Sequence, residues 1–170
     1  MWLMAIGVIL LLVLGISITW PYQRGAPWTP TPMGKIHKML SMAEVGPDDL
    51  LYDMGCGDGR MVVTAARRYG ARAVGIEIDP LRYLWCQFLV SLLGLRERVR
   101  IVYGDFYAQD LHDANVVTCY LLQSTNEKLE SKFKQELPAN ARVVSHEFTF
   151  PGLRLVRTDD EDGLSLYTLN

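Results

Sequence analysis

Three closely spaced glycines follow an apolar run and an acid in residues 51–60, whose sequence is LYDMGCGDGR. The glycines are Gly55, Gly57 and Gly59, and the acid is Asp53. A chain that leaves a parallel strand and reverses into a helix needs residues that tolerate a positive φ and let the backbone approach a ligand closely. The pattern therefore predicts a nucleotide-binding turn, with Asp53 as an anion beside the ligand.

The spacing of these glycines discriminates between two classes of nucleotide ligand. A dinucleotide turn has the pattern G-x-G-x-x-G, and its third glycine would fall at the position of Arg60. The observed G-x-G-x-G spacing after an acid is instead typical of S-adenosylmethionine sites, where Asp53 would face the ammonium group of the cofactor. A carboxylate would repel a pyrophosphate. The spacing therefore indicates S-adenosylmethionine, and a glycine turn without a ligand is the alternative.

Two further acids stand where later strands are expected to end. Glu77 lies 22 residues after Gly55, where nucleotide-binding folds place the carboxylate that accepts the ribose hydroxyls. Asp105 ends the next β-rich run and is placed to accept the amino group of adenine, while Phe106 packs near the ring. Each acid alone is commonly a helix cap or a turn residue. Together with the glycine turn they indicate a cofactor site.

These acids and glycines resemble the motifs of S-adenosylmethionine-dependent methyltransferases with a Rossmann-like fold, and the likeness covers roughly residues 33–170. Three shorter segments resemble, more narrowly, the small lysine methyltransferases that modify the ATP synthase c-subunit and the adenine nucleotide translocase. The narrower resemblance implies a lysine of a protein as the methyl acceptor. The three segments are residues 29–32 (TPTP), 120–122 (YLL) and 143–148 (VVSHEF).

Alternating strand and helix patterns are expected to hold these residues in place. The alternation predicts an α/β fold with a Rossmann-like, doubly wound and mostly parallel sheet, whose strand carboxyl ends carry the site. Residues 153–157 and 164–169 flank an acidic turn and predict an antiparallel C-terminal hairpin. Strands are expected over residues 49–54, 73–78, 99–103, 115–120 and 141–146, and helices over residues 33–43, 59–69, 80–93 and 125–137.

Methyl transfer to lysine sets demands on the acceptor site. Neutralising an amine of pKa near 10.4 at pH 7 costs about 4.6 kcal/mol, so the site should be apolar and aromatic. Tyr120 fits that demand as a catalytic residue that walls the lysine channel and orients the amine. His146, also a catalytic candidate, and Glu147 could receive a proton or bind the substrate ammonium, and a capping or solvent-facing role is equally open. Gln123 and Asn126 are either polar neighbours or helix-start residues.

The residues at the end of the fourth expected strand also distinguish between classes of methyl acceptor. Enzymes that methylate the amino groups of bases or amides resemble one another in an Asn/Asp-Pro-Pro-Tyr/Phe signature there, whereas this chain has TCYL at residues 118–121. That difference disfavours base and amide methylation. A lipid or quinone methyltransferase is the alternative function, and a cofactor-binding membrane protein without catalysis is the second alternative.

Composition limits the class of protein further. With 170 residues, 49% hydrophobic and 21% charged, the chain is long enough for one compact domain. The formal net charge of −2 provides no global attraction for nucleic acid, and we expect no nucleic-acid partner. Cys56, Cys86 and Cys119 lack metal-ligand spacing, so we expect buried thiols and no metal site.

The first 20 residues have a different character. Residues 2–20 form a run of 19 residues without a charge, which as a helix would span about 28 Å and cross a bilayer. No Lys or Arg precedes the run, which disfavours a cleaved signal peptide. Arg24, Lys35 and Lys38 follow it, so the positive-inside rule places the catalytic domain on the cytoplasmic side of a single-pass membrane protein. We expect a transmembrane anchor (residues 1–20), a proline-rich linker (21–32) and a methyltransferase domain (33–170), acting on a lysine of a membrane protein.

Overall fold

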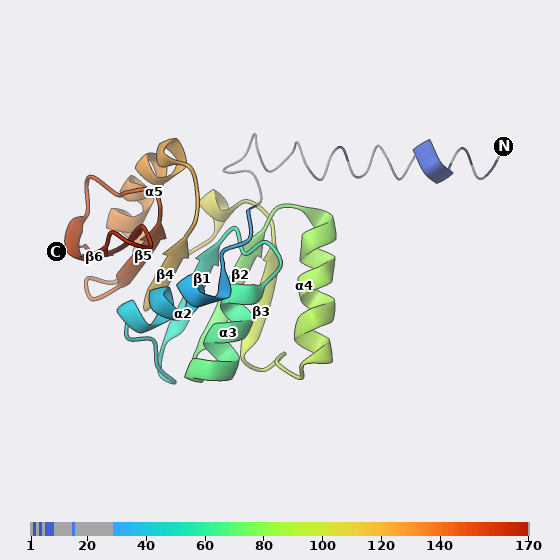
Figure 1. Cartoon of the computed structure of the whole chain (residues 1–170), viewed down its shortest axis with the longest axis horizontal. Coiled ribbons are helices and arrows are strands. Elements are labelled where there is room, and N and C mark those ends of the chain that lie inside the picture. The colour runs from blue at the N-terminus through green and yellow to red at the C-terminus, as the bar shows by residue number, and fades with distance from the viewer. Residues whose placement is uncertain (1, 3, 5, 9–14, 16–28, 170) are drawn as a thin grey trace.

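A seven-stranded sheet forms the centre of the protein in a computed structural model that describes residues 29–169, Trp2, Met4, residues 6–8 and Gly15 (Figure 1). The strand order is β3-β2-β1-β4-β5-β7-β6. The first five strands pair in parallel, and β7 is inserted antiparallel between β5 and β6. The strands are β1 (Leu50–Met54), β2 (Arg72–Glu77), β3 (Val99–Tyr103), β4 (Val116–Cys119), β5 (Arg142–His146), β6 (Arg154–Asp159) and β7 (Leu164–Thr168). This sheet confirms the predicted mostly parallel order and the antiparallel C-terminal pair.

Helices cover the sheet from both sides. One core cluster joins α2 (Met33–Met42), α3 (Arg60–Tyr69) and α4 (Pro80–Leu92) to one face of the sheet. A second cluster on the other face contains the apolar side of α5 (Gln123–Glu136). Because each parallel strand is buried on both faces, its sequence is a nearly continuous apolar run rather than an alternating one.

Two local features differ from the expected boundaries. The connection from β3 to β4 contains only a short 3-10 helix, η1 (Phe106–Ala108), which the periodicity did not predict. Asp105 starts it by accepting a hydrogen bond from the backbone N–H of Tyr107 at 2.9 Å. Helix α5 begins at Gln123, two residues earlier than predicted, after Leu122 in an extended conformation. Both differences are cap or turn effects that hydrophobic periodicity does not report.

The predicted membrane span is left untested. Most of residues 1–20 lie outside the described residues. Among the residues that are described, no helix is both long enough and apolar enough to cross a membrane. The anchor over residues 1–20 therefore stays a prediction from the sequence.

Gly75 allows the glycine turn to pack closely on β2. A Cβ atom at this position would lie 2.7 Å from Cys56 Sγ and 2.9 Å from Cys56 Cβ. We expect Gly75→Ala to push Cys56 away and to lower the free energy of unfolding by about 1–3 kcal/mol, measured by urea denaturation. Gly46→Ala is the control, since nothing lies within 4 Å of its added Cβ. An equal loss in both variants would contradict this account.

Candidate active site

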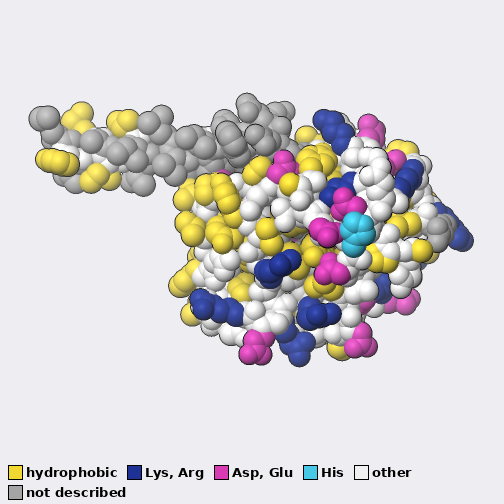
Figure 2. Space-filling model, turned by 180° about the vertical axis from the view of Figure 1, so that it is seen from behind, with side chains coloured by type: hydrophobic (Ala, Val, Ile, Leu, Met, Phe, Trp, Pro, Cys, Tyr) yellow, Lys and Arg dark blue, Asp and Glu magenta, His cyan; other side chains and the backbone are white. Residues whose placement is uncertain are grey.

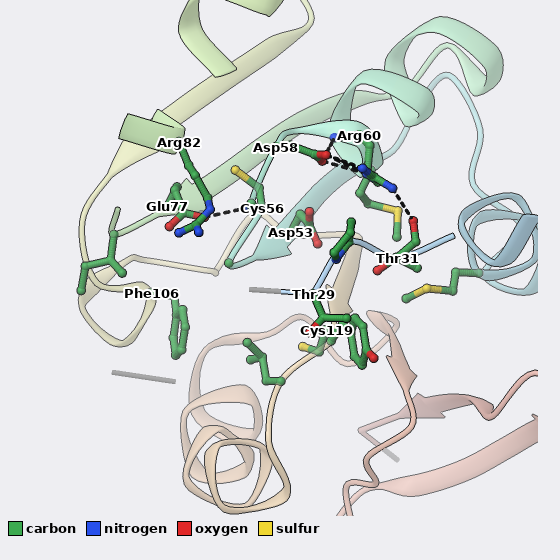
Figure 3. A pocket seen from close by; sticks show the side chains of 18 of the residues that line it. Thr29, Thr31, Asp53, Cys56, Asp58, Arg60, Glu77, Arg82, Phe106 and Cys119 are labelled. Carbon is green, nitrogen blue, oxygen red and sulfur yellow. Dashed lines mark hydrogen bonds and ion pairs between the residues drawn. The ribbon is translucent and has the colours of Figure 1, made fainter. Parts of the chain in front are cut away.

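A pocket opens at the carboxyl ends of the parallel strands. It encloses about 880 Å³, including space open to solvent. Figure 3 shows Asp53 in the middle of the pocket, with Glu77 and Arg82 on one side and Thr31, Asp58 and Arg60 on the other. Every residue predicted to bind the cofactor lines this pocket except Gly59, which starts α3 just behind it. The lining residues from that prediction are Asp53, Gly55, Gly57, Glu77, Asp105 and Phe106.

The glycine turn has the backbone conformation that its sequence predicts. Gly55, Gly57 and Gly59 have φ values of 86°, 59° and 83°, which side-chain-bearing residues rarely adopt. At Gly59 an added Cβ would also lie 3.0 Å from Cys86 Sγ on α4. The turn therefore needs glycine both for its dihedral angles and for the close approach of α3 to α4.

Asp53 is a buried acid that faces the pocket. Its carboxylate accepts a hydrogen bond from Thr118 Oγ1 at 2.8 Å, and the residue is 8% exposed. Burial raises its pKa to about 7, and the nearby carboxylates of Glu77 and Asp58 add to the rise. A cationic ligand in the pocket would stabilise the ionised form of Asp53. The ammonium group of S-adenosylmethionine is such a ligand, so the environment of Asp53 fits the cofactor.

Glu77 organises the backbone around the cofactor site. Its Oε2 accepts a hydrogen bond from Gly57 N–H at 2.7 Å, and its Oε1 accepts one from Asp79 N–H at 2.8 Å. Asp79 in turn caps α4 by accepting from Arg82 N–H at 2.8 Å. Each carboxylate oxygen has a second lone pair, so Glu77 can still receive ribose hydroxyls. This acid therefore joins the glycine turn to the start of α4 as well as facing the predicted ribose.

Asp105 and Phe106 form the wall expected for the adenine. Asp105 follows β3, and Phe106, which is 8% exposed as a residue, begins η1 with its ring 4.8 Å from that of Tyr107, centroid to centroid. The two residues lie next to each other in the pocket lining. A carboxylate beside an aromatic face suits a ring that carries an amino group.

The sequence did not predict two features of the pocket. One is the segment of residues 29–31, which we call the strap, and the other is the ion pair between Arg60 and Asp58. Thr29 and Thr31, at the end of the predicted linker, line the pocket (Figure 3). Arg60 holds the strap by donating to the carbonyl of Thr31 at 3.0 Å, and its Nε donates to Asp58 Oδ1 at 2.9 Å. The sequence carried one signal for this contact, because an arginine directly after the glycine turn is well placed to reach an anionic or carbonyl group.

Tyr120 lies at the end of β4 on the wall of the pocket. Burial raises the pKa of its hydroxyl, and the charge of Glu147 and a hydrogen bond with that carboxylate raise it further. Glu147 has a φ of 66°, an unusual value for a residue with a side chain, and its N–H donates to the carbonyl of Gly163 at 2.7 Å. Backbone strain of this kind is concentrated at functional sites. The structure thus brings the aromatic wall and an acid together.

His146 packs behind Tyr120 and is not among the lining residues of the pocket. Its ring lies 4.0 Å from that of Tyr120, centroid to centroid, and the residue is 2% exposed. The ammonium group of Lys35 lies 3.0 Å from Nε2 of His146 and donates to the carbonyl of Asp162 at 2.9 Å. Burial lowers the pKa of His146, and the charge of Lys35 lowers it further. At neutral pH the imidazole is therefore uncharged.

Gln123 and Asn126 hold the loop that follows β5. The side chain of Gln123 accepts from Thr149 N–H at 3.0 Å and donates to its carbonyl at 3.2 Å. Asn126 is buried and donates to the carbonyl of Phe148 at 3.2 Å. Both residues thus fix the segment next to Glu147 as polar neighbours, and Gln123 is in addition the first residue of α5.

A model of the family described as the ANTKMT methyltransferase domain matches residues 53–157, which contain the glycine turn and the three strand-end acids. This chain belongs to that family. The match confirms the resemblance that the motifs predict. It runs from the last two residues of β1 through β5 into β6, so the ANTKMT methyltransferase domain includes the carboxyl end of every parallel strand.

Individual relatives of this ANTKMT-family chain agree on the reaction type and differ in the acceptor that they are named for. A protein-lysine N-methyltransferase of Saccharolobus islandicus is 42% identical over 132 residues, covering 77% of this chain and 82% of that protein. The adenine nucleotide translocase lysine N-methyltransferase of Mus musculus is 32% identical over 77% of this chain, which spans only 57% of the mouse enzyme. The crystal structure of an RNA methyltransferase from Salinibacter ruber with S-adenosyl-L-homocysteine has a TM-score of 0.79 at 40% identity, covering 83% of this chain and 94% of that one.

Family and fold together identify the reaction and its cofactor. The chain is an S-adenosylmethionine-dependent methyltransferase. We propose that Asp53, Glu77 and Asp105, which all line the pocket, hold the ammonium group, the ribose and the adenine of the cofactor respectively. The cofactor supplies an electrophilic methyl group on a sulfonium.

Two of the three cysteines, Cys56 and Cys119, also line the pocket. Cys56, Cys86 and Cys119 are all buried free thiols, as predicted. Asp110, His112 and Glu136 bring ligand atoms within 4.8 Å of one another, but Glu136 is paired with Lys132 at 2.6 Å. None of these three residues lines the pocket.

Proposed function

We propose that this enzyme methylates the side-chain amine of a lysine in a protein substrate. The observation that carries the proposal is the pairing of Tyr120 with Glu147 at the end of β4, beside the cofactor pocket. An aromatic wall and an acid suit a cation that must be desolvated and then deprotonated. The names of the Saccharolobus islandicus and mouse relatives support the same acceptor.

The charges of the pocket favour a cationic acceptor over a phosphate-bearing one. Its two arginines are already paired, since Arg60 contacts Asp58 at 2.5 Å and Arg82 contacts Asp79 at 3.4 Å. A polynucleotide needs unpaired cations along its backbone. The pocket lining contains four acids, which are Asp53, Asp58, Glu77 and Asp105.

The proposed reaction needs the lysine nitrogen to lose a proton before attack. Contact with the ring of Tyr120 would desolvate the amine and lower its pKa, and the positive charge of Lys35 behind His146 would act in the same direction. Glu147, with its side chain 49% exposed, would accept the proton and release it to solvent. The nitrogen lone pair then bonds to the methyl carbon as the carbon–sulfur bond breaks.

His146 has a positioning role in this scheme. Because its Nε2 accepts from the ammonium group of Lys35, the ring proton of the neutral imidazole lies on Nδ1. Nδ1 is buried and has no hydrogen-bond partner among the described residues. The imidazole is thus poorly placed to accept a substrate proton, and its contact with Tyr120 would set the angle of the channel wall.

Radioactive labelling identifies the acceptor. The purified full-length chain is incubated with methyl-labelled S-adenosylmethionine, membranes and total RNA, and the products are treated separately with protease, ribonuclease and organic solvent. We expect protease-sensitive label that is recovered as methyl-lysine after acid hydrolysis. Ribonuclease-sensitive label would replace the proposal with the RNA acceptor named for the Salinibacter ruber structure. Label in the organic phase would favour the lipid or quinone alternative.

The substitution Glu147→Gln tests whether Glu147 accepts the proton of the substrate lysine without contributing to cofactor binding. We expect its kcat at pH 7 to fall roughly 10- to 100-fold, because a positioned acid–base group typically contributes at least that much. Cofactor affinity should stay unchanged, and the deficit should shrink as the pH rises, because more of the lysine is then neutral without assistance. A kcat equal to that of the unmodified enzyme would remove Glu147 from the mechanism. The matched control is Glu161→Gln, an exposed acid on the β6–β7 turn.

A further inference from the structure

Helix α4 carries a continuous apolar stripe on its outer side. Cys86 and Val90 point into the core. On the opposite side five large apolar residues stand at positions 81, 84, 85, 88 and 92, a spacing that places them on one face along the helix. They are Leu81, Leu84, Trp85, Phe88 and Leu92, with exposed fractions of 44%, 60%, 50%, 58% and 67%. We call them the α4 stripe, and Figure 2 shows apolar side chains gathered on that side of the domain.

The fold does not account for this stripe. Scattered exposed apolar residues are normal in proteins, but a contiguous line of them marks a surface that contacts something apolar. Helix α4 contains no acidic residue, and its one cation, Arg82, is paired with Asp79. A helix that faced only water would carry charges on this side.

The surroundings of the stripe suit the boundary between lipid headgroups and acyl chains. Trp85 packs against Phe88 at a centroid distance of 6.1 Å, and Tyr83 packs against the exposed Tyr103 at 5.4 Å. Trp and Tyr are the aromatic residues enriched at that boundary. Two exposed arginines, Arg96 and Arg98, follow the helix and can reach anionic headgroups with their long side chains, with one exposed acid, Glu97, between them.

The length of chain between the uncharged run and the domain limits how far that run can be from α4. Thr29 lines the same pocket as Arg82, which is in the first turn of α4. Residues 21–28 can separate Thr29 from the run by at most about 28 Å. Residues 2–20 contain no charge. A membrane that held this run would lie within reach of α4.

We propose that the α4 stripe inserts into the interface of an anionic lipid membrane. The stripe and the nearby arginines would then hold the pocket at a fixed height above the bilayer. This proposal goes beyond the choice of methyl acceptor and does not depend on it, because its test reads the position of α4 rather than catalysis.

Fluorescence of Trp85 tests the proposal in the full-length chain. The variant Trp2→Phe/Trp20→Phe/Trp28→Phe leaves Trp85 as the sole tryptophan. We expect its emission to shift to the blue on addition of phosphatidylcholine–phosphatidylglycerol vesicles and to be quenched by brominated acyl chains. Adding Leu84→Asp and Phe88→Asp should reduce the quenching roughly tenfold or more, since each substitution removes a large apolar side chain from the buried surface. Cofactor binding should be unchanged.

A matched control places the reporter on the opposite edge of the sheet. When Trp85→Phe is added to the triple variant, no native tryptophan remains, and Leu155→Trp then places a single reporter on β6, where Leu155 is 53% exposed. It should show no lipid quenching. Trp85 emission that is already blue without vesicles and insensitive to brominated lipid would overturn the proposal, and sedimentation would then distinguish a second copy of the chain from residues 2–20 as the covering element. Equal quenching at both positions would also overturn it.

Discussion

Asp53→Asn is expected to abolish measurable S-adenosylmethionine binding and, at pH 8, to raise the unfolding temperature of the ligand-free enzyme. The buried carboxylate has its pKa raised from 3.8 to about 7. Its ionised form therefore destabilises the fold, by an order of magnitude of about 4 kcal/mol once the pH exceeds 7. The amide keeps the shape without the charge, and it cannot pair with the ammonium group of the cofactor.

The effect of Asp53→Asn on stability should depend on pH. A raised pKa means that the penalty is absent below about pH 4, grows between pH 4 and 7, and is constant above that range. The gain in stability of Asp53→Asn should therefore be largest at pH 8 and shrink toward pH 5, measured by thermal unfolding. For the unmodified enzyme, calorimetry should show cofactor affinity falling up to tenfold per pH unit below about pH 7, because protonated Asp53 must ionise to bind the ammonium. Asp48→Asn, an exposed acid, is the control. Unchanged affinity in Asp53→Asn would refute the assignment.

Glu77→Gln should also abolish cofactor binding, but it should destabilise the enzyme. Both oxygens of Glu77 accept backbone hydrogen bonds, from Gly57 and from Asp79. An amide has one oxygen, so its NH₂ group would face one of these N–H groups, donor against donor. An unsatisfied buried donor and the loss of a charged acceptor together should lower the free energy of unfolding by about 2–4 kcal/mol, measured by urea denaturation.

The opposite stability effects distinguish the two acids. If both substitutions merely disturbed a crowded pocket, both would lower stability. We expect hydrogen exchange to show that Gly57 and the first turn of α4 lose protection in Glu77→Gln and keep it in Asp53→Asn. Glu97→Gln, on the exposed turn before β3, controls for the loss of a carboxylate as such. Stability equal to that of the unmodified enzyme would show that the two hydrogen bonds do not hold the turn.

Much of the fold and of the cofactor site could be predicted because the signals are local. An apolar run buried on both faces reads as a parallel strand wherever it occurs, and β3 covers the same residues that were predicted. Asp53, Glu77 and Asp105 each follow such a run, so their shared place in the pocket follows from the parallel pairing of three strands. The glycine turn is also recognisable from the sequence, because glycine is the residue that readily adopts the positive φ values found there.

The roles of the residues around the methyl acceptor could not be predicted as fully, because these roles depend on contacts between residues that are far apart in the sequence. His146 had seemed able to receive a proton, but Lys35, 111 positions away in sequence, occupies its Nε2. Thr31 enters the pocket only because Arg60 holds its carbonyl across 29 positions. No periodicity or motif reports such pairs.

The glycine turn and the acids near it show which properties follow from the sequence and which follow only from the tertiary structure. By itself the sequence determined the cofactor class, because backbone dihedral angles and the charge of Asp53 are properties of the residues. The tertiary structure alone decided the energetic state of those residues, because desolvation raises the pKa of Asp53 to about 7 and two backbone N–H groups occupy Glu77. The tertiary structure also determined that the α4 stripe is accessible to solvent. The sequence of an apolar helix does not show which of its sides packs against the core.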